Sequence, residues 1–280
     1  MIDIIVPVYN TPLSDLKRCL DSIAKQTFKD FKVYIIDDGS GSETRSFLDE
    51  YVSDKNNFIV THVDNGGVSK ARNIGIEKTN SKYIAFVDAD DTVTSSFLEE
   101  AYNLIIDNDL DIIIGGYDEI KDEKVIRHRL SLPGLHIYED KTINYFLQKL
   151  LSGKTNDQNK EIADCPTGRI YTRLFKRESI GSLRFDTDVH MSEDTLFMID
   201  YTYQVKRIGI VDKIWYNYYK NDYSISSYSI DKKEKMIKDI NDFIEQIKIR
   251  MNKEDNIDIK NSYKERINKA NRYIDDIKGI

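Results

Sequence analysis

Three aspartates occupy four consecutive positions where an apolar run ends, in the segment Val87-Asp88-Ala89-Asp90-Asp91. Carboxylates this close repel one another, so a positive partner is expected beside them. A hard divalent cation such as Mg²⁺ or Mn²⁺ suits clustered oxygen ligands, and a diphosphate commonly supplies the rest of its shell. On its own the run does not decide between a metal site and a solvated turn or helix cap.

The neighbouring elements place this acidic run at the end of a strand. Residues 83–87 form a short apolar stretch typical of a strand, and Ser96 and Glu99 have the spacing of a helix capping box. The acids then lie at the carboxyl end of a strand, where open α/β sheets bind their ligands.

Three more apolar runs end in polar residues, and the first two are separated by a segment with leucines and an isoleucine at helical spacing. This alternation predicts a parallel sheet whose strand ends offer polar side chains to one rim. The runs are residues 2–8, 31–36 and 58–63, and the polar residues that follow are Tyr9, Asn10, Asp37, Asp38, Lys70 and Arg72.

The order of these motifs resembles that of the inverting glycosyltransferases of family 2, which have the GT-A nucleotide-sugar-binding fold. The resemblance is dense over residues 1–120, sparser to about residue 230 and absent beyond it. The matching segments are Pro7-Val8-Tyr9-Asn10, Asp37-Asp38-Gly39-Ser40, Gly67-Val68-Ser69-Lys70-Ala71-Arg72-Asn73, Asp88-Ala89-Asp90-Asp91 and Ser192-Glu193-Asp194.

For the nucleotide, the resemblance implies that Pro7 and Tyr9 line the pocket, with the Tyr9 ring against the base. It implies that Asp38 accepts a hydrogen bond from the uracil imide and that Arg72 lies beside the nucleotide and diphosphate. Each role has a structural alternative. Tyr9 is otherwise a buried aromatic, Arg72 pairs with an acid on the sheet rim, and one of Asp37 and Asp38 forms an Asx turn, with Asp37 the stronger candidate.

For the metal, the resemblance implies that Asp90 is the direct ligand of Mn²⁺ or Mg²⁺ and that Asp88 contacts ribose or a metal-bound water. Asp91 is either an acceptor or phosphate contact or a helix-terminal acid outside the coordination shell.

For the proton transfer, Asp194 matches the carboxylate that acts as the base in the family, and Glu193 is expected to orient an acceptor or brace the loop. Both acids also suit the first turn of a helix, where negative charge is favoured by about 0.3 to 1 kcal/mol. His190 is either a contact to the metal, phosphates or acceptor, or an exposed loop residue. The other three histidines have no supporting constellation and are expected at the surface or at strand ends.

The sequence therefore predicts an α/β enzyme of GT-A type with a mostly parallel central sheet. We expect a nucleotide-sugar-binding half at 1–120, an acceptor-binding half at 121–230 and a helical extension at 231–280. The predicted reaction moves a hexose, glucose or galactose being favoured, from a UDP-sugar to a glycan, lipid-linked or protein-linked acceptor. A noncatalytic nucleotide-sugar-binding module and a sugar nucleotidyltransferase are the alternatives.

Composition agrees with this class. The 280 residues carry a formal charge of −7, and the lack of a basic excess argues against nucleic acid as a partner. No stretch approaches the roughly 20 apolar residues of a membrane span, and no signal peptide is recognisable, so a cytoplasmic enzyme is expected. Its cysteines, Cys19 and Cys165, are expected to be reduced.

Three segments are harder to assign. Residues 152–163 are polar and predict a loop over donor or acceptor. Lys220, Ser224 and Ser226 are further candidates for contacts near the diphosphate. From about residue 231, two isoleucine stripes predict helices that pack on the domain or on a second subunit, with the inner face of the membrane as a further partner.

Overall fold

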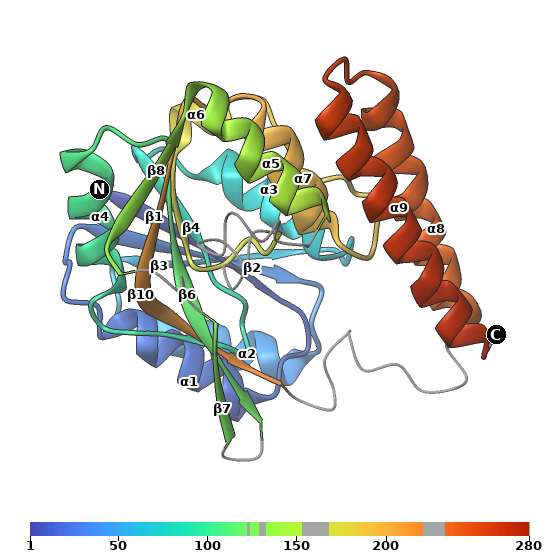
Figure 1. The fold of residues 1–280 in the computed structure, drawn as a ribbon. Helices are drawn as coiled ribbons and strands as arrows, with labels where there is room; N and C mark the ends of the chain where they lie inside the picture. The colour runs from blue at the N-terminus through green and yellow to red at the C-terminus, as the bar shows by residue number, and fades with distance from the viewer. Residues whose placement is uncertain (122–123, 129–132, 153–167, 221–232, 280) are drawn as a thin grey trace.

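The computed structural model describes residues 1–121, 124–128, 133–152, 168–220 and 233–279. Its centre is a ten-stranded mixed sheet with the order β3-β2-β1-β4-β9-β6-β10-β5, to which β7 and β8 add through β6 and β10 (Figure 1). The strands are β1 (Ile2–Val8), β2 (Phe31–Asp38), β3 (Phe58–Val63), β4 (Tyr83–Phe86), β5 (Thr92–Val93), β6 (Ile112–Lys121), β7 (Lys124–His128), β8 (Leu135–Glu139), β9 (Arg173–Lys176) and β10 (Arg207–Tyr219).

The four strands from β3 to β4 are parallel, which confirms the prediction for the N-terminal part of the sheet. Beyond β4 the sheet is mixed, because β9 is antiparallel to both β4 and β6, and β5 is antiparallel to β10. β9 is short, with four residues.

Helices cover both faces of the sheet (Figure 1). They are α1 (Leu13–Ala24), α2 (Ser42–Val52), α3 (Val68–Lys78), α4 (Phe97–Asp107), α5 (Ile143–Ser152), α6 (Arg177–Ile180), α7 (Glu193–Thr202), α8 (Lys233–Asn252) and α9 (Ile257–Lys278), with a 3₁₀ turn at Asp140–Thr142. The expected capping box before α4 is wrong. Ser96 has helical dihedrals, so its hydroxyl caps nothing, and Glu99 instead accepts a hydrogen bond from Thr27.

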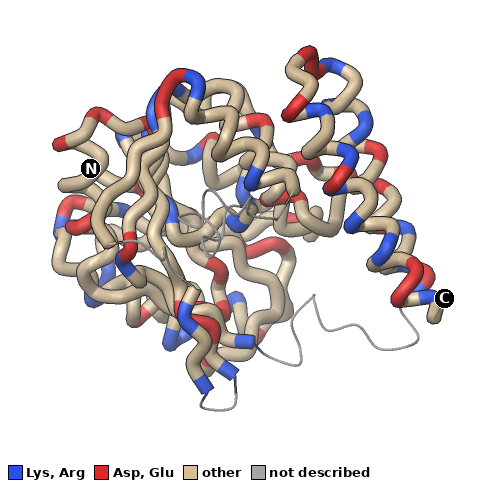
Figure 2. Tube along the Cα trace, in the orientation of Figure 1, with Lys and Arg blue, Asp and Glu red and all other residues tan. Residues whose placement is uncertain are grey.

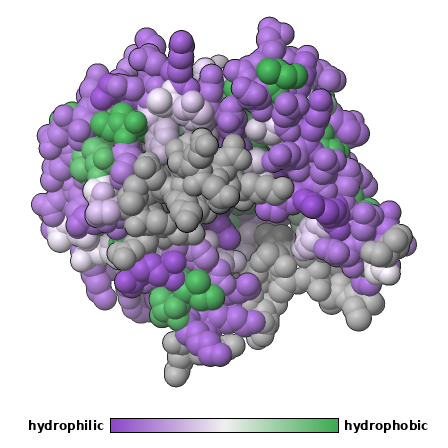
Figure 3. Space-filling view, viewed as in Figure 1, coloured by the Kyte–Doolittle hydropathy of each residue, from purple (hydrophilic) through white to green (hydrophobic). Residues whose placement is uncertain are grey.

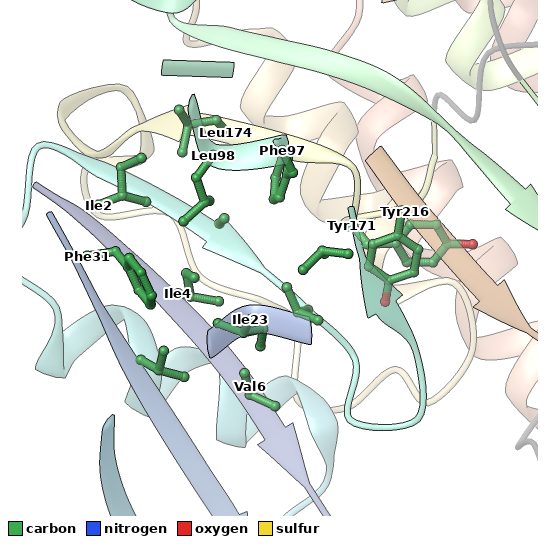
Figure 4. Packing of buried hydrophobic residues seen from close by; sticks show 14 of the residues in the cluster. Ile2, Ile4, Val6, Ile23, Phe31, Phe97, Leu98, Tyr171, Leu174 and Tyr216 are labelled. Carbon is green, nitrogen blue, oxygen red and sulfur yellow. The ribbon is translucent and has the colours of Figure 1, made fainter. Parts of the chain in front are cut away.

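Two hydrophobic clusters lie on opposite faces of the sheet, and alternate side chains of β1 point into one or the other. Ile4 and Val6 belong to the cluster formed with α1, α2 and α4, whereas Ile5 joins the cluster formed with α3, α5 and α7. Figure 4 shows Ile2, Ile4 and Val6 in the first cluster. Burial on both faces explains why β1 is apolar at almost every position.

The C-terminal helices α8 and α9 form a hairpin beside α5 and α7 (Figure 1). Phe243, Ile247 and Tyr263 extend the second cluster onto this hairpin, so the predicted helices pack on their own domain. Packing on a second subunit or a membrane stays a prediction. Along these helices acidic and basic residues are interspersed (Figure 2).

The face of the molecule seen in Figure 3 is mostly hydrophilic where described residues form it, with small scattered apolar spots. No helix within the described ranges is long and apolar enough to cross a membrane. Cys19 is a buried free thiol on α1, while Cys165 and most of the predicted loop at 152–163 lie outside the described residues.

Candidate active site

Arg72 joins the two acidic segments that the sequence singled out. It projects from α3, is only 5% exposed, and donates hydrogen bonds to Asp88 over 2.9 Å and to Glu193 over 2.8 Å. Burial alone would lower the pKa of Arg72, but Asp88, Glu193 and Asp194 outweigh it and raise that pKa. The pairing with acids, given above as an alternative for Arg72, is present, and Glu193 braces the loop.

Asp194 lies in the first turn of α7, where its carboxylate accepts a hydrogen bond from the Thr195 backbone N–H over 2.7 Å. Burial and the neighbouring Glu193 raise the pKa of Asp194 to about 6, against the opposing effect of Arg72. Ser192, just before the helix, has a left-handed backbone with φ of 62°, an unfavourable conformation for a residue with a side chain. The acid pair is therefore held in a fixed, strained turn.

Asp90 is half-buried beside Asp88, and burial together with that neighbouring charge raises the pKa of Asp90 to about 6. Arg18 donates to the Asp90 backbone oxygen over 2.7 Å, so it holds the loop without pairing with the carboxylate. A bound cation would offset the repulsion between the Asp88 and Asp90 carboxylates, and carboxylate oxygens are ligands suited to Mg²⁺ or Mn²⁺.

No group of three or more His, Cys, Asp or Glu side chains in the described ranges is arranged to hold a metal ion. A cation at Asp90 would thus need further oxygen ligands from a bound molecule. A diphosphate offers such oxygens.

Asp91 points into the protein, which removes it as an acceptor or phosphate contact. It is 1% exposed, and its carboxylate accepts hydrogen bonds from the Tyr216 hydroxyl over 2.7 Å and the Tyr219 backbone N–H over 2.8 Å. The Tyr216 hydroxyl also accepts a bond from the Asp88 backbone N–H. Asp91 therefore fastens the acidic loop to β10.

The loops after β1 and β2 are bound to each other. The Asn10 backbone N–H donates to the Ser40 hydroxyl over 3.0 Å, and the Asn10 side chain accepts from Gly41 N–H over 2.9 Å. Pro7 is buried in β1, whereas Tyr9 is 56% exposed, so the alternative of a buried aromatic at Tyr9 is wrong. An exposed ring at a strand end is available to stack on a base.

Asp37 forms the expected Asx turn, accepting a hydrogen bond from the Ser40 N–H over 3.0 Å. Asp38 is also engaged: it is 3% exposed, and its two carboxylate oxygens accept 2.8 Å bonds from the backbone N–H groups of Gly66 and Gly67. Asp38 thus shapes the turn before α3, a role that the sequence did not predict for it.

His62 has two carboxylate partners that were not predicted from the sequence. Its Nδ1 lies 2.6 Å from Asp37, and its Nε2 lies 3.1 Å from Asp49. Burial alone would lower the pKa of His62, but the two carboxylates raise it. The signal was available in principle, since β3 pairs with β2 and sets His62 opposite Asp37.

Two of the remaining predicted contacts have exposed side chains. His190 is exposed in the loop before α7, and Lys220 is exposed 3.4 Å from Glu119. Ser224 and Ser226 lie outside the described residues.

A family model for glycosyl transferase family 2 matches residues 3–180. This chain belongs to that family. It is 27% identical over 230 residues to the uncharacterized glycosyltransferase EpsJ of Bacillus subtilis, covering 81% of this chain and 63% of that protein. The chain therefore spans less than two thirds of the length of this relative.

Solved structures share the GT-A fold. TarS of S. aureus in complex with UDP-GlcNAc superposes with a TM-score of 0.67 at 22% identity, covering 88% of this chain and 66% of that one. The mannosyltransferase PcManGT of Pyrobaculum calidifontis, in complex with GDP-Man and Mn²⁺, has a TM-score of 0.60 at 15% identity, with 95% and 68% covered. These likenesses confirm the fold predicted from the sequence.

Proposed function

We propose that this chain transfers a hexose from a UDP-sugar to a hydroxyl group of a glycan, lipid-linked or protein-linked acceptor, with inversion at the anomeric carbon. One observation carries the proposal. Arg72 bonds both Asp88 and Glu193, so the acidic loop after β4 and the start of α7 belong to a single site. Family membership supports the reaction class, and the mechanism below assigns the steps.

Asp194 is the proposed general base. In a single inverting displacement the acceptor hydroxyl must lose its proton as it attacks the anomeric carbon. With a pKa of about 6, the Asp194 carboxylate is mostly ionised at pH 7 and is a better proton acceptor than an ordinary aspartate. Arg72 and Glu193 hold the turn from which Asp194 acts.

Asp90 is the proposed ligand of Mn²⁺ or Mg²⁺. When bound there, the cation supplies Lewis-acid stabilisation of the charge on the departing diphosphate. Asp88 remains tied to Arg72, and Asp91 to Tyr216, so the chain presents Asp90 from a loop fixed on both sides. PcManGT, of similar fold, was crystallised with Mn²⁺, which supports use of a divalent ion here.

The proposed uridine pocket lies between the ends of β1 and β2. The exposed Tyr9 ring would stack on the base beside Pro7. Asp38 holds the turn at Gly66, and its Oδ1 accepts one bond there, which leaves a lone pair for the uracil imide. TarS, of similar fold, was crystallised with UDP-GlcNAc, which supports a uridine donor.

A panel of UDP-, GDP- and CDP-sugars incubated with Mn²⁺ tests this function, with hydrolysis of the donor as the readout and Asp194→Asn as the control. We expect turnover of a UDP-hexose, and turnover about 10²- to 10⁴-fold slower by the variant. Preference for a guanosine or cytidine donor would contradict the roles of Tyr9 and Asp38.

Two competing functions are separated by this panel together with a second assay that contains UTP and a sugar 1-phosphate. A noncatalytic binding module would bind UDP without turning over any donor. A nucleotidyltransferase would release pyrophosphate from UTP and a sugar 1-phosphate.

A further inference from the structure

Arg169 lies against a cluster of tyrosine rings to which the mechanism above gives no role. Its guanidinium carbon is 5.1 Å from the ring centroids of Tyr117 and Tyr218 and 5.5 Å from that of Tyr171. It also donates a hydrogen bond to the Tyr171 hydroxyl. Within the part of the chain that the structure describes, Arg169 forms no ion pair with a carboxylate.

The chain at Arg169 runs against the proposed base. A Cβ at the preceding Gly168 would lie 2.7 Å from the Thr195 hydroxyl oxygen, so only glycine allows this approach to α7. Thr195 is the residue whose backbone N–H holds the Asp194 carboxylate. In agreement with this proximity, the positive charge of Arg169 lowers the pKa of Asp194, against the larger effect of burial.

The same ring cluster reaches the acidic loop. Tyr171 stacks on Tyr216 with centroids 4.3 Å apart and planes 6° from parallel, and Figure 4 shows the two rings face to face. The Tyr216 hydroxyl bonds to Asp91. Arg169 therefore belongs to the assembly that links the proposed metal loop to the proposed base.

A half-buried cation that forms no ion pair within the described ranges is costly, and ring faces offset only about 0.5 to 2 kcal/mol of that cost each. The planar fork of a guanidinium matches the oxygens of a phosphate group. We propose that Arg169 binds phosphate oxygens of a substrate, either the donor diphosphate or a phosphate group carried by the acceptor. The inference rests on the proposed function, which brings both substrates to this site.

Calorimetric titration with UDP and with uridine, both in Mn²⁺, tests the donor as the source. The proteins are the wild type, Arg169→Gln and Arg169→Lys. If the donor diphosphate is bound, Arg169→Gln weakens UDP by about tenfold or more while uridine is unchanged, because a hydrogen bond to a charged group is lost. Arg169→Lys keeps the positive charge but lacks the planar guanidinium, so its affinity for UDP should lie between those of the wild type and Arg169→Gln.

Titration of the UDP and Mn²⁺ complex with glycerol 3-phosphate and with glycerol tests the acceptor as the source. An acceptor-phosphate site binds glycerol 3-phosphate in preference to glycerol, and Arg169→Gln removes that preference. Thermal unfolding of each variant checks folding. Arg127→Gln is the matched control, since Arg127 is exposed and paired with Asp118.

The inference is overturned if Arg169→Gln binds UDP as the wild type does and no binding of glycerol 3-phosphate depends on Arg169. Failure of the proposed function looks different: the wild type binds UDP, with or without help from Arg169, yet turns over no donor. A wild type that binds neither UDP nor uridine overturns both.

Discussion

The guanidinium of Arg72 lies 2.8 Å from the carboxylate of Glu193, although 121 residues separate them in the chain. Because Arg72 also bonds Asp88, one side chain fixes the distance between the loop after β4 and the start of α7. The geometry of both proposed functions, metal binding and proton transfer, depends on this one cation.

Replacement of Arg72 by alanine should destabilise the fold. The change leaves Asp88 and Glu193 without their shared partner, which typically costs about 3 to 5 kcal/mol for a buried pair. Urea unfolding followed by the fluorescence of Trp215 measures the loss. Arg127→Ala removes an exposed pair and should cost at most about 1 kcal/mol. Equal stability of wild type and Arg72→Ala would show that the bridge is dispensable.

Replacement of Asp194 by asparagine should lower kcat by about 10²- to 10⁴-fold with UDP affinity unchanged, as expected for a general base. Because the pKa of Asp194 is raised to about 6, wild-type kcat should fall as the pH drops below that value, and the variant should lack this limb. Asp188→Asn, in the same loop and exposed, is the control. A parallel loss of UDP affinity would argue against the assignment.

Chelation and Asp90→Ala should each abolish transfer, because the charge on the leaving diphosphate is then unbalanced. Mn²⁺ or Mg²⁺ should restore the chelated wild type but not the variant. Asp107→Ala, at the exposed end of α4, should behave as the wild type. Full activity in excess chelator would refute the role of Asp90.

The pairs that His62 forms with Asp37 and Asp49 should make stability depend on pH. They raise the pKa of folded His62 above its ordinary value of about 6.5, so their contribution is complete below that pH and is lost as the pH rises through the folded-state pKa. The difference in Tm between wild type and His62→Gln should therefore shrink from pH 5.5 to pH 8.5. His190→Gln, at an exposed position, should show no such trend. A constant difference would mean that the charge of His62 is irrelevant.

Apolar runs made the sheet predictable. β1 and β3 have the bounds expected from the sequence. β1 is buried on both faces and is apolar at almost every position, whereas β3, at the edge of the sheet, is buried only at Phe58. The order of polar motifs at the strand ends then identified the family.

Which carboxylates face outward was not predictable from spacing. Asp38 and Asp91 are adjacent to acids of similar sequence context, yet their oxygens are taken by backbone and tyrosine donors from distant segments. The position of Arg169 was not predictable for the same reason, because the rings around it come from β6, β10 and the chain before β9. Such arrangements arise only when the sheet is assembled.

Because the Asp91 side chain points inward, neighbouring acids in this short run have different roles: Asp91 fixes the loop, and Asp90 is left for the proposed chemistry. A relative that lost Asp90 but kept Asp91 would retain its hydroxyl tether at Tyr216, fold normally and do no chemistry. The number of aspartates in this loop is thus a poor guide to whether a related protein is catalytically active. The residue at the position of Asp90 is the informative one.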